Sequence, residues 1–180
     1  VIPSSASSGV VSIGTTPGSP LPAGTNSSFL LPEVNVPYYD DIENYYLSFD
    51  HWYHIDSTSS GDGDGAWVEY RVKDSNSWSD WNYLSPESGY PSTMSTDGPN
   101  PNGAPVGTIP VFASETYSGW VSDTFDLESL VNETSDKLQF RFHIWTHPDA
   151  ENERPGWFID NIRFNNDGVN YGAWHHGCYT

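Results

Sequence analysis

The chain has 180 residues, a length that suits one domain, and 36% of them are hydrophobic and 15% aromatic. It carries 24 Asp and Glu residues against 6 Lys and Arg, a formal net charge of −18 at pH 7. Such a surface repels nucleic-acid phosphates and anionic lipids, which argues against a nucleic-acid-binding protein. No apolar run approaches the about 20 residues that span a bilayer, which argues against membrane insertion.

Cysteine usage and glycosylation sequons bear on the compartment. Cys178 is the single cysteine, so no intrachain disulfide can form. Asn26 and Asn132 each begin an Asn-x-Ser/Thr sequon, the acceptor pattern of exported proteins. We therefore predict an extracellular or cell-surface protein, and because the chain does not begin with Met we expect a processed product.

The first 37 residues differ in composition from the rest. They are rich in Ser, Gly, Pro and Thr, with a single apolar island, GVVSI, at residues 9–13. Such a segment cannot bury enough apolar surface to order itself. We predict an N-terminal arm with a short strand over 1–37 and a folded domain over 38–180.

From Tyr38 onward the hydrophobic pattern has a period of two. Alternation of apolar and polar residues in YYLSFDHWYHID, GAWVEYRVK and KLQFRFHIWT predicts half-buried strands, and GWFIDNIRF is typical of another. Shorter strands are expected in SDWNYL, PVFAS, GWVSDTFD and YGAWHH, and one helical turn in DLESLVNE. The segment 85–105 is too polar and proline-rich for an element. This pattern predicts an all-β protein with antiparallel strands in a two-sheet sandwich.

Five stretches in a fixed order carry a family resemblance. They are LSFDHWYHID, DGDGAWVEYRV, WNYLSPESGYP, SGWVSDTFDLESL and LQFRFHIWTHPDAENERPGWFIDNIRF. Residues 45–165 thereby resemble the MAM-like jelly-roll module found beside the catalytic domain of immune-inhibitor-A-type secreted peptidases. The resemblance implies a non-catalytic jelly roll that serves adhesion, ligand binding or assembly. The His-Glu-x-x-His zinc motif of those peptidases is absent from the sequence, so proteolysis does not carry over.

Several acidic residues are candidates for a structural calcium site. His51 and His54 do not form a zinc site, because strand residues three apart point to opposite faces, and His51 is expected in the core. Asp160 is predicted to share a face with Phe158, Ile162 and Phe164, where a carboxylate needs a partner or a metal. Calcium prefers oxygen ligands, and the acidic candidates besides Asp160 are Asp56, Asp62, Asp64, Asp40, Asp41 and Glu43. Without a metal, Asp62 and Asp64 are read as solvated residues of a hairpin connection.

Aromatic residues on polar strand faces suggest carbohydrate binding. Exposed indoles stack on sugar rings, and the candidates are Trp52, Trp67 and Trp145. The alternative is that loops or a neighbouring subunit cover them. Hydrolysis is not indicated, because among so many carboxylates some pair always has a suitable separation.

The arm is the strongest indication of assembly. A strand flanked by Ser, Gly and Pro can pair with the edge of another copy through Val10, Val11 and Ile13, or it can complete its own sheet. We predict a non-catalytic, self-assembling surface or filament subunit whose partners are copies of itself. The alternatives are an ancillary glycan- or protein-binding module of a larger secreted enzyme and, more remotely, a peptidase fragment.

Overall fold

A computed structural model describes most of the chain. The described residues are 3, 5–9, 12–16, 18–37, 42, 44–56, 63–94, 98–114, 119–149 and 154–166, together with the backbone of 169–171. Within them the fold is all-β, with thirteen strands and one 3₁₀ turn, η2 (Glu128–Leu130), at the place where the sequence predicts a helical turn. None of the described helical segments is long and apolar enough to cross a membrane.

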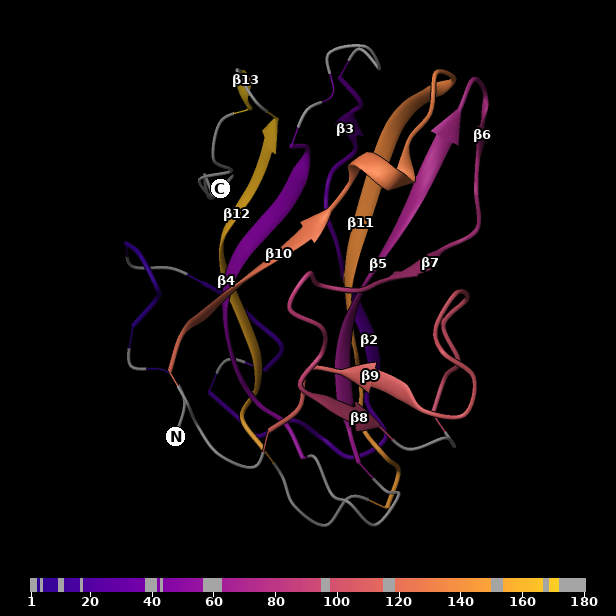
Figure 1. The fold of residues 1–180 in the computed structure, drawn as a ribbon. Helices are drawn as coiled ribbons and strands as arrows, with labels where there is room; N and C mark the ends of the chain where they lie inside the picture. The colour runs from indigo at the N-terminus through magenta and orange to yellow at the C-terminus, as the bar shows by residue number, and fades with distance from the viewer. Residues whose placement is uncertain are drawn as a thin grey trace.

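Two large antiparallel sheets contain most of the strands (Figure 1). The five-stranded sheet has the order β1-β12-β4-β10, with β13 also paired to β12, and is formed by β1 (Ile13–Gly14), β4 (Tyr46–His54), β10 (Val121–Asp126), β12 (Gly156–Asn166) and β13 (Val169–Tyr171). The six-stranded sheet has the order β2-β11-β5-β6, with β3 on β11 and β7 on β5, and is formed by β2 (Asn26–Leu30), β3 (Val34–Asn35), β5 (Gly65–Asp74), β6 (Ser77–Trp78), β7 (Asn82–Leu84) and β11 (Ser135–Trp145).

A third, two-stranded sheet pairs β8 (Ser92–Met94) with β9 (Ile109–Val111). Strand β8 lies in the segment where the sequence predicts no element, because pairing with β9 outweighs the poor strand propensity of the segment. The sheet arrangement is a curled half-barrel plus other sheets. The predicted all-β antiparallel class is therefore confirmed, whereas the predicted two-sheet jelly roll is not clearly present.

One aromatic core joins the two large sheets. Phe49 of β4 meets Phe142 of β11 edge to face with ring centroids 5.0 Å apart, and Phe142 meets Trp157 of β12 at 5.5 Å. The inward positions of β4, Leu47, Phe49 and His51, are all buried, as the alternation predicts. Aromatic rings bury large areas, and this offsets the modest hydrophobic fraction of the chain.

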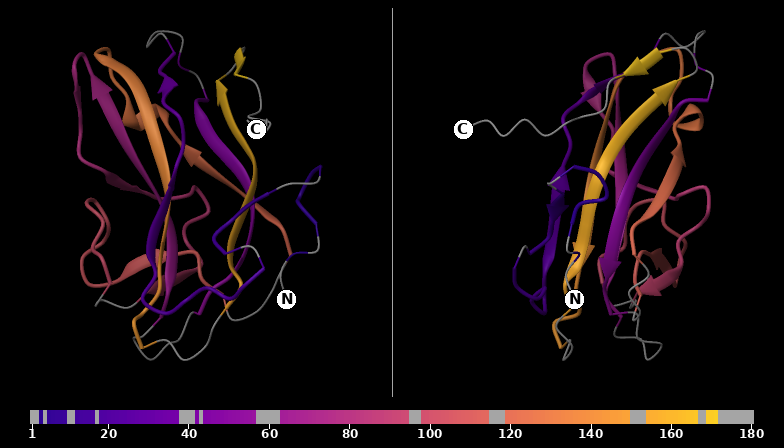
Figure 2. Two further views of the ribbon diagram at one scale, coloured as in Figure 1. Left: turned by 180° about the vertical axis from the view of Figure 1, so that it is seen from behind. Right: turned by 90° about the vertical axis from the view of Figure 1, so that its left-hand side faces the viewer.

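The N-terminal arm lies against both large sheets of its own chain. Strand β1 pairs with β12, and strands β2 and β3 pair with successive parts of β11. Figure 2 shows the arm on one side of the molecule and the β8–β9 sheet on the opposite side. The arm therefore supplies an edge strand to each large sheet.

Candidate functional site

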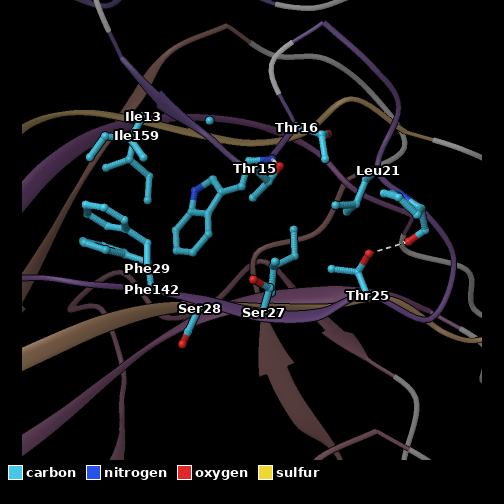
Figure 3. Close-up of a pocket in the computed structure, with 14 residues that line it drawn as sticks. Ile13, Thr15, Thr16, Leu21, Thr25, Ser27, Ser28, Phe29, Phe142 and Ile159 are labelled. Carbon is cyan, nitrogen blue, oxygen red and sulfur yellow. Dashed lines mark hydrogen bonds between the residues drawn. The ribbon is translucent and has the colours of Figure 1, made fainter.

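An apolar cavity of about 350 Å³ lies beneath the arm, between β1 and β2 (Figure 3). Its walls come from the arm through Ile13, Leu21 and Phe29, and its floor comes from both sheets through Phe142 and Trp157. No lining residue carries a charge, although the whole chain has 24 acidic residues. This is the type of apolar space that accommodates hydrophobic side chains and excludes carboxylates.

Backbone hydrogen bonds hold the arm above this cavity. The Thr15 N–H donates to the Trp157 carbonyl at 3.0 Å, and the Leu21 N–H donates to the Arg154 carbonyl at 2.7 Å. Thr25 and Thr146 are joined by a backbone bond of 2.8 Å and by a bond from the Thr25 N–H to the Thr146 hydroxyl at 2.7 Å. Such bonds need little of a particular side chain, so any copy of the arm can form them.

Of the three assembly candidates, the structure places one. Ile13 lies opposite Ile159 in the β1–β12 pair of its own chain. Val10 and Val11 lie outside the described residues. The structure thus shows the arm paired within one chain, which is the alternative that the sequence left open.

A buried hydrogen-bonded chain runs from β12 through β4 to β10. His51 is 0% exposed, its Nδ1 accepts from the Trp157 indole N–H at 3.0 Å, and its Nε2 lies 2.8 Å from Asp123 Oδ2. Because an indole N–H only donates, the imidazole proton must sit on Nε2 and donate to Asp123. The Ser88 hydroxyl donates to the other Asp123 oxygen at 2.6 Å.

This chain connects strands and leaves no imidazole nitrogen for general-base work. Burial lowers the pKa of His51, although the Asp123 carboxylate opposes this, so the ring stays neutral at pH 7. The serine contacts Asp123 and not His51, so the order differs from that of a nucleophile–base–carboxylate triad. The prediction of a hydrogen-bonded core histidine is confirmed.

Of the metal candidates that the structure describes, Asp56 and Asp64 lie together, whereas Asp160 lies elsewhere, opposite Asp50. Asp56 and Asp64 are 4% and 3% exposed and lie together, with the Asp64 N–H donating to the Asp56 carbonyl at 2.9 Å. Burial, with some help from the Asp56 charge, raises the pKa of Asp64 to about 6, although the His147 N–H bonds its carboxylate at 2.7 Å. The expectation that Asp64 is a solvated hairpin residue is wrong, because its side chain is buried and accepts a hydrogen bond from the His147 N–H.

Asp160 shares a face of its strand with Phe158, as predicted, but not with Ile162 and Phe164. A bulge between Asp160 and Arg163, with Asn161 at φ 50°, shifts the alternation by one residue. Ile162 is therefore in the core, whereas Asp160 lies opposite Asp50 of β4 and accepts hydrogen bonds from the Ser8 and Asn161 N–H groups at 2.8 Å.

Asp56 and Asp64 are thus the two predicted calcium ligands that the structure places side by side, and the neighbour of Asp160, Asp50, was not predicted as a ligand. Asp40, Asp41, Glu43 and Asp62 lie outside the described residues. Within the part of the chain that the structure describes, no three His, Cys, Asp or Glu side chains converge as a metal site would require. Calcium binding stays a prediction.

The three tryptophans predicted to stack on sugars are not exposed. Trp52 and Trp67 are 0% exposed and Trp145 is 7% exposed. Trp52 packs against Phe158 at 5.6 Å, and Trp67 stacks on His143 at 4.3 Å with an interplanar angle of 11°. The prediction of exposed platforms at these positions is wrong, because outward-facing strand residues are covered by their cross-strand neighbours and by other segments.

A different aromatic group, outside the three tryptophans predicted to bind sugars, lies on the six-stranded sheet. The Arg71 guanidinium is 4.5 Å from the Trp78 ring centroid and 4.7 Å from that of Trp81, and the Arg141 guanidinium is 4.5 Å from Trp81. Both indoles are partly exposed. Alternation placed Arg71 and Arg141 on polar faces, but their meeting with Trp81 depends on the pairing of β5 with β11.

The two sequons lie in different settings. The Asn26 side chain is occupied, since its Oδ1 lies 2.7 Å from His143 Nε2. Asn132 is exposed, and its Oδ1 accepts from the Thr134 N–H and hydroxyl at 2.8 and 2.7 Å.

No protein-family model and no curated protein sequence matches this chain. The resemblance to a MAM-like module is therefore supported only to the level of an all-β antiparallel fold with several sheets.

Proposed function

We propose that this protein is a non-catalytic structural subunit at the cell surface or outside the cell, and that it polymerises by docking its arm on a neighbouring copy. One observation carries the proposal: a single arm, whose one charged side chain is Glu33, forms edge strands of both large sheets and leaves about 350 Å³ of apolar space beneath it. The first charged residue of the chain is Glu33, so residues 1–32 match the uncharged cavity.

Exchange of the arm between copies is the docking mode that we infer. A neighbour's β1 and β2 can form the same backbone bonds to β12 and β11 that the chain's own arm forms, so the exchange needs no new contacts. When each arm passes to the next copy and the rotation does not close, the product is an open filament. At the level of fold we propose a jelly-roll relative, supported by two antiparallel sheets around one aromatic core.

A disulfide trap tests the exchange directly. Ile13 and Ile159 are cross-strand partners, so an Ile13→Cys/Ile159→Cys variant in a Cys178→Ser background links the arm to whichever chain it is paired with. After oxidation of the concentrated protein, exchange predicts a ladder of linked chains on a non-reducing gel. A single monomer band would show that the arm stays on its own chain and would overturn the proposal.

The matched control is a cysteine pair away from the arm. Ser48 and Thr124 are cross-strand partners on β4 and β10, so Ser48→Cys/Thr124→Cys in the same background must give intrachain links alone. A ladder from this control would mean that the arm variant's ladder reports random collision and not exchange.

A second candidate function is an ancillary binding module. The half-exposed indoles of Trp78 and Trp81, with Arg71 and Arg141 beside them, favour it. This reading predicts a monomer that binds through the outer face of the six-stranded sheet.

A further inference from the structure

The few cations of this chain are concentrated on one surface. In the β5–β11 ladder Lys73 lies opposite Lys137, Arg71 opposite Gln139, and Glu69 opposite Arg141. Side chains at alternate positions and at paired positions share a face, so four of the chain's six Lys and Arg residues lie on the outer face of the six-stranded sheet. Elsewhere the acidic residues far outnumber the basic ones.

Two of these four cations have carboxylate partners. Arg141 makes a forked pair with Glu69, at 2.7 Å from Nε and 3.0 Å from Nη2, and Lys137 lies 2.5 Å from a Glu33 oxygen. Burial raises the pKa of Glu69, but hydrogen bonds from His143 and Arg141 outweigh it and hold that pKa low, so the pair is ionised.

The other two cations are Arg71, which bonds a neutral amide, and Lys73, which lies opposite Lys137 on β11 and Trp78 on β6. Arg71 donates through Nε and Nη2 to the Gln139 amide oxygen, at 3.0 and 2.6 Å, and that oxygen carries no charge. Among the described residues, neither Arg71 nor Lys73 has an ion-pair partner within 4.0 Å. The face therefore presents positive charge beyond what its own carboxylates neutralise.

The indoles on this face pack against arginine guanidinium groups. Arg71 lies 4.5 Å from Trp78 and 4.7 Å from Trp81, and the Gln139 side chain that holds Arg71 is itself held by the Leu31 carbonyl at 3.0 Å. Immobilised aromatic rings lose little conformational freedom on binding, so they suit ligands that stack on a ring. Sugar rings stack in this way, and carboxylates pair with the neighbouring cations.

We propose that the outer face formed by Arg71, Lys73, Lys137, Trp78 and Trp81 binds an acidic polysaccharide, one built of carboxylate-bearing pyranose rings. The cations recognise the carboxylates and the indoles recognise the ring faces. On a chain of net charge −18 such a ligand is repelled everywhere else, so binding is confined to this face. This inference does not depend on arm exchange, because all five residues of the face lie outside residues 1–37, on β5, β6 and β11 and in the segment after β6.

The test uses oligogalacturonate and its methyl ester, which has the same rings without the charge. Binding to the full chain is measured by isothermal titration calorimetry and by indole fluorescence, with chelator present so that calcium does not bridge protein and ligand. We expect the acid to bind and the ester to bind at least about tenfold more weakly, a difference of about 1.4 kcal/mol. Equal binding of the two oligomers, or no binding of either, would overturn the proposal.

Charge reversal locates the site. Lys73→Glu is expected to weaken binding of the acid by at least about tenfold, whereas Arg163→Glu changes net charge by the same amount on the other large sheet and should leave it unchanged. Equal losses in both variants would mean that general electrostatics, and not this face, governs binding. Trp81→Phe is expected to lower affinity for acid and ester by the same factor.

The acidic partner of this face could instead be a second copy of this acidic chain. Sedimentation velocity of the wild type and the variants without ligand tests this alternative. If the wild type associates, Lys73→Glu does not, and neither oligomer binds, the face is a contact between copies and the polysaccharide inference fails. The disulfide trap at Ile13 and Ile159 reports arm exchange separately from either result.

Discussion

The buried chain Trp157–His51–Asp123 makes a measurable prediction about stability. His51→Leu keeps an apolar side chain in the core but removes both hydrogen bonds of the imidazole. The Trp157 indole N–H, on a residue 2% exposed, is then left unsatisfied, which costs about 1–3 kcal/mol. The Asp123 side chain, 13% exposed, loses a charge-assisted bond worth about 1.5–3 kcal/mol but recovers part of it from water.

We therefore expect His51→Leu to lower the free energy of unfolding by about 2–4 kcal/mol. In a chain of this length such a loss lowers Tm by about 5–15 °C. The assay is urea denaturation followed by near-UV circular dichroism, with the disulfide-free Cys178→Ser chain as reference. His51→Gln, which can retain an N–H toward Asp123, is expected to lose less than His51→Leu.

A double-mutant cycle separates the hydrogen bond from general packing. If His51 and Trp157 are coupled through their bond, then His51→Leu and Trp157→Phe together cost about 1–2 kcal/mol less than the sum of the two single changes. Additivity to within about 0.5 kcal/mol, or a His51→Leu loss below that size, would refute the view that this chain stabilises the core.

Four further predictions concern pH, packing and metal. The folded pKa of His51 lies below its ordinary value of 6.5, so the stabilisation by the neutral imidazole is present above pH 6.5 and is lost as the pH falls below it. The urea midpoint of the wild type should therefore fall as the pH is lowered through 6.5, and that of His51→Leu should fall less. The effect of Asp64 on stability has the opposite pH dependence, because its folded pKa of about 6 exceeds the ordinary value of 3.8: stability is lost as the pH rises from 3.8 through 6. Asp64→Asn should remove that loss when stability is measured, with chelator present, at pH values below 3.8 and above 6. Gly65→Ala should destabilise by about 1–3 kcal/mol in the same denaturation assay, because its Cβ would lie 2.7 Å from Val111 Cγ1. Calcium bound by Asp56 and Asp64 should raise the wild-type Tm at pH 7 and leave that of Asp64→Asn unchanged, and an equal rise in both would exclude this pair as the site.

Local pattern was enough to predict the long strands β4, β5, β11 and β12 and one important side chain, but not the short strands β2, β3 and β8. In the stretch from Tyr45 to Asp56, alternation placed Leu47, Phe49 and His51 on one face, and all three are buried. The inference holds because a regular strand has a side-chain period of two, which does not depend on what the strand pairs with.

The same rule failed at Asp160. A bulge inserts one residue and reverses the alternation beyond it, and Asn161 adopts the positive φ of 50° that this needs. Nothing in the letters GWFIDNIRF marks the shift. Asp160 thus faces Asp50 and not the core residues Ile162 and Phe164, and the metal site predicted around it changes its neighbours.

The local sequence pattern also did not predict which tryptophan side chains are exposed to solvent. Trp52, Trp67 and Trp145 lie on faces that alternate with core residues, yet each is buried, whereas Trp78 and Trp81 in short peripheral segments are partly exposed. Which face of a sheet remains open to solvent depends on where the connecting segments lie. That is decided by the whole chain and not by neighbours in sequence.

The sequence by itself determined the class of the protein: its period-two runs specify antiparallel β structure, and its charge of −18 specifies which partners are repelled. Only the tertiary structure decided which residues meet. Strand pairing brings β5 and β11 together, and with them Arg71, Lys73 and Lys137, from positions more than sixty residues apart. It also places the arm along the edges of both sheets, over an apolar cavity. The reason is that periodicity is a property of single strands, whereas register, bulges and coverage arise from long-range contacts between them.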